Sequence, residues 1–391
     1  MSPRSLRHAL FPATLAVGLL VGSAAPAPGA PPPLVTGSPA TTVPTTVAPP
    51  PIRHVFVINL ENEGYERTFG WNSPAPYLAR TLRSRGMLLS QYYATAHNSL
   101  PNYIAQISGQ GPNSETQSDC QVYSDFKGTG TAPPQQAVGQ GCVYPASVPT
   151  LPKQLEAKGL SWAGFMEDMA LSPSTAPITC RHPALDTRDD TQTAERGDQY
   201  AARHNPFVYF HSIIDNQRSC DRHVLPFQRR FPDALASVAS TPNFSYITPN
   251  LCNDGHDEPC VNGQPGGLVS ADRWLQKWVP RILSSPAFQQ DGLLVVTFDE
   301  AEAFGSDRDA SACCGEGPGP NSPLPGIYGP GGGRVGAVLV SPFIRPGSFN
   351  DTAYNHYGLL CSVEDIFGLT HIGYAATTQR CFGTDVYNKG V

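Results

Sequence analysis

Short runs of apolar residues, separated by polar and glycine-rich segments, set the pattern of this chain. The two clearest runs are residues 54–60 (HVFVINL) and 292–298 (GLLVVTF), which are rich in β-branched and aromatic residues. Unbroken apolar runs of this length are typical of strands that are covered on both faces of a sheet. Further strands are expected at residues 87–93, 161–166, 244–249 and 335–341.

Helical spacing alternates with these strands along the chain. Apolar residues recur at helical intervals in residues 76–85, 152–158 and 271–283, and again after His356. Alternating strands and helices predict an α/β fold with a mostly parallel central sheet and helices on both faces. Residues 119–149 lack such periodicity and are rich in Cys, Gly, Pro and Gln, so we expect a long loop held by disulfides.

The first 51 residues differ from the rest in composition. Arg4 and Arg7 precede an apolar run and a group of small residues, which predicts a secretory signal peptide over residues 1–30, with an uncleaved anchor as the alternative. Residues 31–51 are mainly Pro, Thr, Val, Ala and Gly and indicate an extended linker. A catalytic domain is expected over residues 52–391. The protein should be secreted (extracellular or periplasmic), with no stable membrane insertion after signal cleavage.

The net charge and the cysteine content limit which binding partners and which kinds of metal site are expected. The formal net charge of −6 gives no support to a nucleic-acid partner, and an anionic substrate would need a locally positive site, for example a bound cation. The ten cysteines follow an export signal, so we expect disulfides rather than a thiolate metal site. Cys252 with Cys260 and Cys120 with Cys142 are plausible pairs, whereas the adjacent residues 313 and 314 are expected to pair with separate partners.

Oxygen-bearing side chains follow three of the expected strands, as Glu61-Asn62, Asn253-Asp254 and Asp299-Glu300. Any one of these pairs alone is as readily explained as a helix cap or a turn. Three of them at the same edge of a parallel sheet indicate a hard divalent cation, with Ca, Mg, Mn and Fe all compatible with oxygen ligands.

Ser99 is the candidate nucleophile. A serine before Leu-Pro is ordinarily a capping or turn residue. His97 and Asn102 lie close to it in sequence, however, and offer a proton carrier and an amide donor of the kind that a phosphoryl group requires. His204, His256 and His356 each sit beside turn-forming or polar residues and together would supply a general acid and phosphoryl contacts, although each alone is more often a surface residue. No GxSxG elbow and no P-loop are present.

These motifs resemble the phosphoesterase family of secreted bacterial phospholipases C and acid phosphatases, which has an alkaline-phosphatase-like fold, and the chain is most similar to its compact secreted acid phosphatases. The segments that carry the resemblance are HVFVINLENEGYERTFG from His54, HNSLPNYIAQISG from His97, HNPFVYF from His204, PNLCNDGHD from Pro249, LLVVTFDEAE from Leu293 and NHYGLLCSVEDIFGL from Asn355. The resemblance implies that the metal ligands are Glu61, Asn62, Ser99, Asp299 and Glu300. It further implies catalytic roles for Ser99, His204 and His256, and substrate binding by Asn102, His97, Asp254 and His356.

The expected function is hydrolysis of phosphate esters through a phosphoserine, as in a metal-dependent acid phosphatase acting on a small-molecule or lipid phosphate ester. A phospholipase C or another phosphodiesterase that uses the same site is the alternative. The chain stops soon after the His356 helix, whereas larger phospholipases C have an extended C-terminal region, and this difference favours the phosphatase. A secreted, disulfide-rich binding protein is the rival from another class, and it is disfavoured because Ser99, Glu61 and Asp299 are all present. The sequence predicts no particular oligomeric state.

Overall fold

The computed structural model describes residues 48–170, 178–377 and 380–389. These residues belong to one compact unit whose boundary lies at Thr46. The predicted signal peptide (1–30) lies outside the described residues, and so does the predicted linker up to residue 47. No helix in the described part of the chain combines the length and the apolar character needed to cross a membrane.

An eight-stranded sheet with the order β11-β2-β10-β9-β1-β8-β6-β7 forms the centre of the unit. Neighbouring strands pair in parallel, except that β10 runs antiparallel to both β9 and β2. The mostly parallel α/β sheet expected from the alternating pattern is therefore confirmed. The strands of this sheet are β1 (His54–Leu60), β2 (Met87–Leu89), β6 (Trp162–Met166), β7 (Val224–Pro226), β8 (Phe244–Thr248), β9 (Gly292–Phe298), β10 (Ala337–Val340) and β11 (Ser348–Asn350).

Two separate two-stranded sheets accompany the main sheet. β3 (Tyr92–Tyr93) pairs with β12 (Tyr354–Asn355), and β4 (Lys127–Ala132) pairs with β5 (Gln136–Gln140). The second pair is a hairpin within the segment 119–149, so the long loop expected there contains regular structure that its weak periodicity did not reveal.

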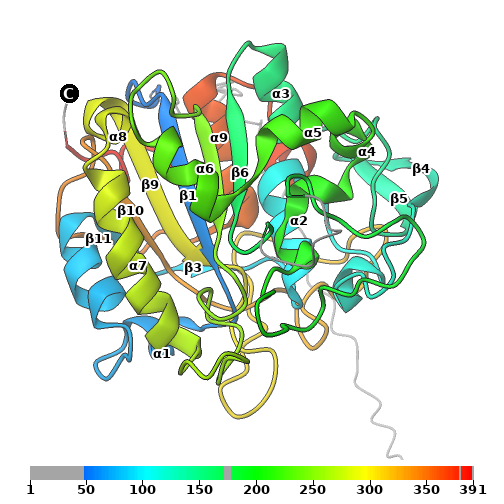
Figure 1. Cartoon of the computed structure of the whole chain (residues 1–391), viewed down its shortest axis with the longest axis horizontal. Helices are drawn as coiled ribbons and strands as arrows, with labels where there is room; N and C mark the ends of the chain where they lie inside the picture. Colours follow the sequence, from blue (N-terminus) through cyan, green and yellow to red (C-terminus); the bar gives the residue numbers. More distant parts are fainter. Residues whose placement is uncertain (1–47, 171–177, 378–379, 390–391) are drawn as a thin grey trace, which may run out of the picture. The chain divides into compact units, whose positions relative to one another are not determined.

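Helices cover both faces of the sheet (Figure 1). Phe56 of β1 packs against Phe288 of α8, with ring centroids 6.4 Å apart, whereas Asn59 of β1 accepts a hydrogen bond from Gln106 of α2. Successive side chains of a strand point to opposite faces, so α8 and α2 lie on opposite sides of the sheet. The α-helices are α1 (Tyr65–Phe69), α2 (Ser99–Ser108), α3 (Leu151–Ala157), α4 (His211–Ile214), α5 (Gln217–His223), α6 (Phe227–Ala234), α7 (Gly267–Leu283), α8 (Pro286–Asp291) and α9 (His356–Phe367).

The remaining helical turns are tighter or wider than an α-helix. The segment expected as a helix over residues 76–85 forms a π-helical turn, Tyr77–Leu82, followed by a 3₁₀ turn, Arg83–Arg85. Asp272 of α7 anchors the start of this segment, because its carboxylate accepts the backbone N–H groups of Tyr77 and Leu78. Further 3₁₀ turns cover Thr116–Ser118, Ala202–His204, Pro206–Tyr209 and Gly373–Ala376.

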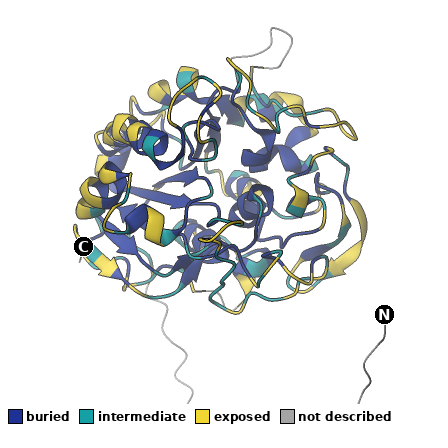
Figure 2. Cartoon of the chain, turned by 90° about the horizontal axis from the view of Figure 1, so that it is seen from below, coloured by how far each residue is buried: buried dark blue, intermediate teal, exposed yellow. Residues whose placement is uncertain are grey.

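The two central strands explain why their sequences are continuously apolar. All seven residues of β1 and all seven of β9 are buried, as the dark interior of Figure 2 illustrates. They pair in register from His54 with Gly292 to Leu60 with Phe298. Because the two strands are parallel and end level with each other, the residues that follow them, Glu61 and Asp299, emerge side by side at the same edge of the sheet.

Five disulfides join all ten cysteines, which all lie in the described residues. The expected pairs Cys120–Cys142 and Cys252–Cys260 are present, and Cys180–Cys220 and Cys361–Cys381 add two more. The expectation of separate partners for residues 313 and 314 is wrong, because Cys313 and Cys314 are joined to each other. Both belong to a loop without regular structure, where the backbone can bring neighbouring sulfurs together.

Candidate active site

Ser99 is the first residue of α2 and lies at the carboxyl edge of the sheet. The residue before it, Asn98, has a φ of 64°, a left-handed conformation that asparagine tolerates better than most residues and that directs the chain into the helix. The Ser99 side chain is almost fully buried. Its hydroxyl donates a hydrogen bond of 2.8 Å to Oε2 of Glu61, the residue that follows β1. The serine is therefore held by a carboxylate rather than by the backbone of its own helix.

The Glu61 carboxylate is the meeting point of several elements. Its Oε1 accepts a hydrogen bond from the hydroxyl of Tyr103, one turn after Ser99 on α2. Its Oε2 lies 3.3 Å from Nε2 of His204, although this nitrogen is not oriented for a hydrogen bond. The His204 ring stacks on Tyr103 with centroids 5.3 Å apart. Ser99 and His204 thus face the same carboxylate oxygen from two sides.

Asp254 extends this cluster from the loop after β8. Its Oδ2 lies 3.1 Å from Nδ1 of His204, and its backbone carbonyl accepts the N–H of Glu61. Ligand atoms of Glu61, His204 and Asp254 all lie within 4.8 Å of one another, and all three residues are buried. The set combines two carboxylates with an imidazole, a donor combination that binds divalent metals in proteins.

Asp299 and Glu300 follow β9 and complete the acidic group. Oδ1 of Asp299 accepts the backbone N–H of Asn62 at 3.1 Å, whereas its Oδ2 is buried without a hydrogen-bond partner among the described residues. Glu300 accepts the backbone N–H of Asn98 and pairs with Nδ1 of His97. The three predicted strand ends therefore do come together at one edge of the sheet.

Repulsion among the buried carboxylates of this group favours the binding of a cation. Burial raises the pKa of Glu61 well above the usual value for a glutamate, and the nearby carboxylates of Asp299 and Asp254 raise it further. Burial likewise raises the pKa values of Asp254, Asp299 and Glu300 well above their usual range. Buried carboxylates that repel one another either hold protons or bind a cation. Oδ2 of Asp299 and Nε2 of His204 have no hydrogen-bond partner among the described residues, so both atoms are available as ligands for a cation.

The observed cluster differs from the predicted set of metal ligands in two respects. His204, predicted to be catalytic, and Asp254, predicted to bind substrate, belong with Glu61 to the cluster that suits a metal. Glu300, expected to be a ligand, instead pairs with His97 on the outer side of the cluster. Asn62 is half-buried with a φ of 56°, and the contact that ties it to the group is made by its backbone N–H.

Arg203 supplies a positive charge that the sequence analysis missed. Its guanidinium is only 3% exposed, donates from Nη1 to the carbonyl of Gln192 and lies with Nη2 3.0 Å from Nε2 of His256. Its Nε is 3.9 Å from the carboxylate of Asp119. That carboxylate accepts the backbone N–H groups at the start of α2, including that of Leu100 at 2.9 Å. The anion that this arginine and the N-terminus of α2 hold in the structure is thus the Asp119 carboxylate.

His256 is the more accessible of the two predicted catalytic histidines. Its side chain is 31% exposed, and its Nδ1 lies 2.8 Å from the carboxylate of Asp257. Its Nε2 accepts from Arg203, which assigns the ring proton to Nδ1. His204, by contrast, is buried between carboxylates, and burial lowers its pKa well below the usual value for a histidine.

Three of the predicted substrate contacts have their polar atoms engaged by protein groups. Asn102 donates to the carbonyls of residues 96 and 98 and accepts the N–H groups of residues 95 and 96, so it shapes the loop before Ser99. His97 bridges Glu300 and the carbonyl of Asp309. His356 lies behind β9, with Nε2 2.6 Å from the carbonyl of Asp299 and Nδ1 3.1 Å from the hydroxyl of Tyr92. These three side chains position neighbouring groups in the structure, and their contact with substrate stays a prediction.

Two residues of the site had a signal in the sequence that was not used. Tyr103 lies four residues after Ser99, the spacing that places two side chains on the same face of a helix. Arg203 directly precedes His204, within a segment in which polar residues alternate with apolar and aromatic ones. Because a buried arginine needs a partner for its charge, Arg203 indicates a charged site nearby.

Comparison with known proteins gives consistent results. The model of the phosphoesterase family matches residues 74–370. A probable acid phosphatase of Kluyveromyces lactis is 25% identical over 82% of this chain and 59% of its own length, and an acid phosphatase of Aspergillus fumigatus is 25% identical over 81% and 55%. A phosphatidylinositol-3-phosphatase of Mycobacterium tuberculosis is 25% identical over 86% of this chain and 84% of its own length. The chain thus spans a little over half the length of the fungal relatives.

A solved structure from Vibrio parahaemolyticus, described as a protein in the alkaline phosphatase superfamily, aligns with 90% of this chain and 77% of its own at 12% identity, with a TM-score of 0.48. The family assignment rests on the sequence match, which covers the helix that begins at Ser99 and the loops that carry Arg203, Asp254 and Asp299. By this match over most of its length, the chain belongs to the phosphoesterase family.

Proposed function

We propose that this protein is a phosphomonoesterase of the acid-phosphatase type that acts through a phosphoserine at Ser99. The observation that carries this proposal is the position of the Ser99 hydroxyl. It lies at the N-terminus of α2, 2.8 Å from the Glu61 carboxylate, in a cluster that also contains His204 and Asp254. A buried hydroxyl at a helix N-terminus, beside a proton acceptor, suits phosphoryl transfer to a serine.

A divalent cation fits the acidic cluster. Glu61, His204, Asp254 and Asp299 would hold it through their clustered and unpartnered donor atoms, and Ser99 and Asn62 are the further ligands that the family resemblance implies. When bound, such an ion would neutralise the clustered carboxylates and stabilise negative charge on the phosphoryl oxygens. Because oxygen ligands dominate, calcium, magnesium, manganese and iron all remain suitable.

The residues of the chain support a two-step displacement. In the first step Oγ of Ser99 attacks phosphorus, its proton passes to Glu61 as the nearest acceptor, and the bond between phosphorus and the alcohol oxygen breaks. We assign protonation of the leaving alcohol to His256 in its imidazolium form, whose second proton, on Nε2, would pass to the alcohol oxygen once Nε2 no longer accepts from Arg203; its ring is accessible, whereas His204 is enclosed. In the second step water attacks the phosphoserine and gives a proton to His256, the bond between phosphorus and Oγ breaks, and Oγ takes back the proton held by Glu61 as phosphate is released. We propose that Arg203, which contacts His256, also binds phosphoryl oxygens in both steps.

The comparisons favour monoesters over diesters. The fungal relatives are named acid phosphatases and the mycobacterial relative a phosphatidylinositol-3-phosphatase, and these names all denote removal of a terminal phosphate. The phosphodiesterase alternative, including a phospholipase C, uses the same site chemistry and is tested alongside the monoesterase below. Since a proton donor is required, activity should decline toward alkaline pH, and a rate that rises steadily to about pH 9 would contradict the acid assignment.

We further propose that the protein is secreted and that residues 52–391 form the catalytic domain. The complete pairing of ten cysteines supports an oxidising compartment, where disulfides persist. The family match from residue 74 to residue 370 falls inside the proposed domain.

The test is hydrolysis of p-nitrophenyl phosphate by the wild type and by Ser99→Ala, each with and without EDTA and after metal is added back. Ser108→Ala is a matched control, because Ser108 is a buried serine of the same helix that bonds only to its own backbone region. We expect Ser99→Ala to lose activity by about a thousandfold or more, with Ser108→Ala near wild type.

Acid quenching during turnover should trap one phosphoryl group on Ser99, detectable by intact mass and peptide mapping. Full activity in Ser99→Ala would remove the nucleophile assignment. Faster turnover of bis(p-nitrophenyl) phosphate or phosphatidylcholine than of the monoester would favour the phosphodiesterase alternative.

A further inference from the structure

The outer side of the helical layer that contains α7 is strongly basic. Trp274 and Trp278 of α7 pack against Phe227 of α6, and Asp272 of α7 holds the start of the helical turns of residues 77–85. α6 and α7 cover the same face of the central sheet (Figure 1). Together these three elements contain eight arginine and lysine residues and two aspartates, so they carry a formal charge of +6 in a chain whose net charge is −6.

We call the positively charged side chains of these three elements the basic face. Seven of them are exposed and one, Arg83, is half-buried. Of the two aspartates only Asp233 is exposed, because Asp272 is buried and accepts backbone N–H groups. Among the described residues, no cation of the basic face forms an ion pair with a carboxylate. The basic face consists of Arg80, Arg83, Arg85, Arg229, Arg230, Arg273, Lys277 and Arg281.

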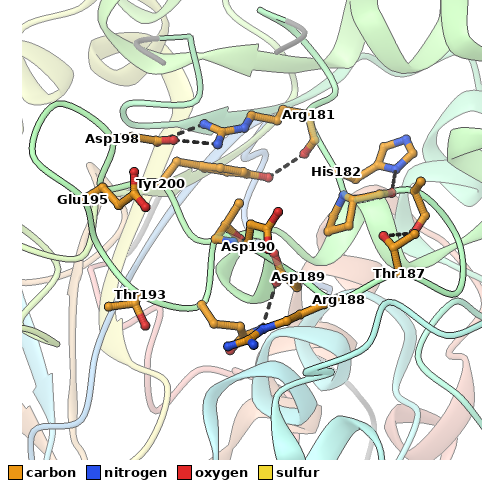
Figure 3. A pocket seen from close by; sticks show the side chains of 14 residues that line it. Arg181, His182, Thr187, Arg188, Asp189, Asp190, Thr193, Glu195, Asp198 and Tyr200 are labelled. Atoms are coloured by element: carbon orange, nitrogen blue, oxygen red, sulfur yellow. Dashed lines mark hydrogen bonds and ion pairs between the residues drawn. The ribbon is translucent and has the colours of Figure 1, made fainter. Parts of the chain in front are cut away.

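Several arginines outside the basic face lie against carboxylates instead. Arg181, which lines the pocket shown in Figure 3, makes a two-pronged ion pair with Asp198, with distances of 2.9 and 2.6 Å. Arg67 lies 2.8 Å from Glu258. Positive charge at those places is neutralised within the protein, whereas the charge of the basic face is left for solvent ions or for an anionic partner.

The cations of α7 form a row along the helix. Arg273, Lys277 and Arg281 are four residues apart, a spacing that places them on one side of the helix. Nζ of Lys277 and the guanidinium carbon of Arg281 lie 5.1 and 4.7 Å from the centroid of the Trp278 ring. Like charges four residues apart destabilise a helix, so the row does not serve the stability of α7. An anionic partner would relieve its repulsion.

The arrangement of the cations suits an extended partner. The row on α7 spans about 12 Å of helix, and the other cations flank it on α6 and on residues 77–85. A small anion would need several donors that converge on one point, whereas side chains on the outer sides of helices diverge. An extended anionic surface can contact all of them at once.

Trp71 adjoins the basic face and indicates which kind of surface it meets. Its backbone carbonyl accepts a hydrogen bond of 3.1 Å from Nη2 of Arg80, and the residue is 89% exposed. Tryptophan is enriched where proteins meet the interface between a membrane and water, because its ring is apolar and its N–H is polar. A soluble polyanion would use only the charges, whereas a lipid surface would use the charges and the indole.

We infer that the basic face binds the surface of a bilayer that contains anionic lipids. The contact is peripheral, with the arginine and lysine side chains on the lipid headgroups and the Trp71 indole in the headgroup layer. No residue of the basic face belongs to the candidate active site, so this inference does not depend on the proposed function.

The experiment measures sedimentation of the protein with sucrose-loaded vesicles. The vesicles are made of phosphatidylcholine alone or with about 30% phosphatidylglycerol, and binding is measured at about 0.05 M and about 0.5 M NaCl, which differ strongly in electrostatic screening. All forms carry Ser99→Ala, so that no lipid is hydrolysed during the measurement. Melting temperatures confirm that each form is folded.

Two triple variants are compared on this background. The test variant removes the row on α7 by Arg273→Gln, Lys277→Gln and Arg281→Gln. The control removes the same charge from exposed positions outside the basic face, by Arg188→Gln, Arg218→Gln and Arg222→Gln.

We expect binding to vesicles that contain phosphatidylglycerol at low salt, release at high salt and no binding to phosphatidylcholine alone. The test variant should bind about a hundredfold more weakly, since each cation near an anionic bilayer strengthens binding about fivefold, and the control should stay near the parent. With Ser99 intact, the α7 substitutions should leave kcat/KM for p-nitrophenyl phosphate unchanged. No binding to the anionic vesicles, or an equal loss of binding in the test variant and the control, would overturn the inference.

Tryptophan fluorescence separates a bilayer from a soluble polyanion. The chain has four tryptophans, and the three other than Trp71 are buried. Anionic vesicles should therefore shift the emission of Trp71 to shorter wavelength, and Trp71→Phe should abolish the shift. Binding to soluble polyphosphate without binding to vesicles would overturn the assignment to a lipid surface, and so would vesicle binding that leaves the Trp71 emission unchanged.

Discussion

Replacing Glu364 by glutamine should stabilise the protein at neutral pH and leave its stability in acid almost unchanged. Glu364 is a fully buried residue of α9, and its carboxyl accepts the backbone N–H of Ile372 at 3.1 Å. Burial raises its pKa from 4.5 to about 9, and the hydrogen bond from Ile372 offsets only part of this rise. Glutamine keeps the shape and the acceptor oxygen but does not titrate.

The sign and size of the effect follow from proton linkage. Below pH 4.5 the carboxyl is protonated in both the folded and the unfolded chain, so its contribution to stability is fully present. As pH rises from 4.5 toward about 9, the unfolded chain releases the proton while the folded protein keeps it. The free energy of unfolding then falls by at most about 1.4 kcal/mol per pH unit. Near pH 7.5 the limit is about 4 kcal/mol, and we expect about 2 kcal/mol after the surroundings relax.

The assay is thermal unfolding of the wild type and Glu364→Gln between about pH 4.5 and pH 8. A gain of about 2 kcal/mol at pH 7.5 corresponds to a rise of several degrees in melting temperature, and the gain should vanish near pH 4.5. Glu195→Gln, at an exposed glutamate, is the control and should follow the wild type. Identical pH dependence in the wild type and Glu364→Gln would refute the reasoning, because the buried carboxyl would then contribute no uptake of protons on folding.

Three further predictions concern the candidate site. Arg203→Met should lower kcat/KM for p-nitrophenyl phosphate about a hundredfold, because a charge-assisted contact to the phosphoryl group is lost; an unchanged KM for the substrate and Ki for phosphate would contradict its role in anion binding. Asn102→Ala should lower the free energy of unfolding in urea by about 2 kcal/mol, since loop N–H and carbonyl groups lose their partners, and a stability equal to wild type would count against the positioning role. EDTA should lower the melting temperature more near pH 7.5 than near pH 5, because ionised carboxylates at Glu61, Asp254 and Asp299 repel one another without a cation. Adding metal back should reverse the change, and equal shifts at both pH values would argue against a cation there.

Much of the central sheet was predictable from local pattern. The bounds expected for β1 and β9, residues 54–60 and 292–298, agree with the structure. Strands covered on both faces tolerate few polar side chains, so their apolar runs begin and end where the strands do. The short strands β7 and β11 were missed, because three residues are too few to show any periodicity.

The candidate site was predictable in composition and less so in detail. Glu61 and Asp299 were expected together, since residues that follow neighbouring parallel strands share an edge of the sheet. The direction in which each side chain points could not be predicted from the sequence. Asn102 bonds mainly to backbone groups, His356 bonds to the carbonyl of Asp299 and the Tyr92 hydroxyl, and His204 turns toward Glu61 and Asp254, because each follows the local geometry of its loop or helix.

The sequence by itself determined the long central strands, and which of their ends carry acidic residues, since these depend on neighbours a few positions away. Only the tertiary structure decided that Arg203 reaches His256 and that the segment from Arg181 to Tyr200 lines a pocket. It also decided that Cys313 pairs with Cys314. Contacts of this kind depend on how loops far apart in the sequence pack over the sheet edge, and loops carry no periodic signal from which their path can be read.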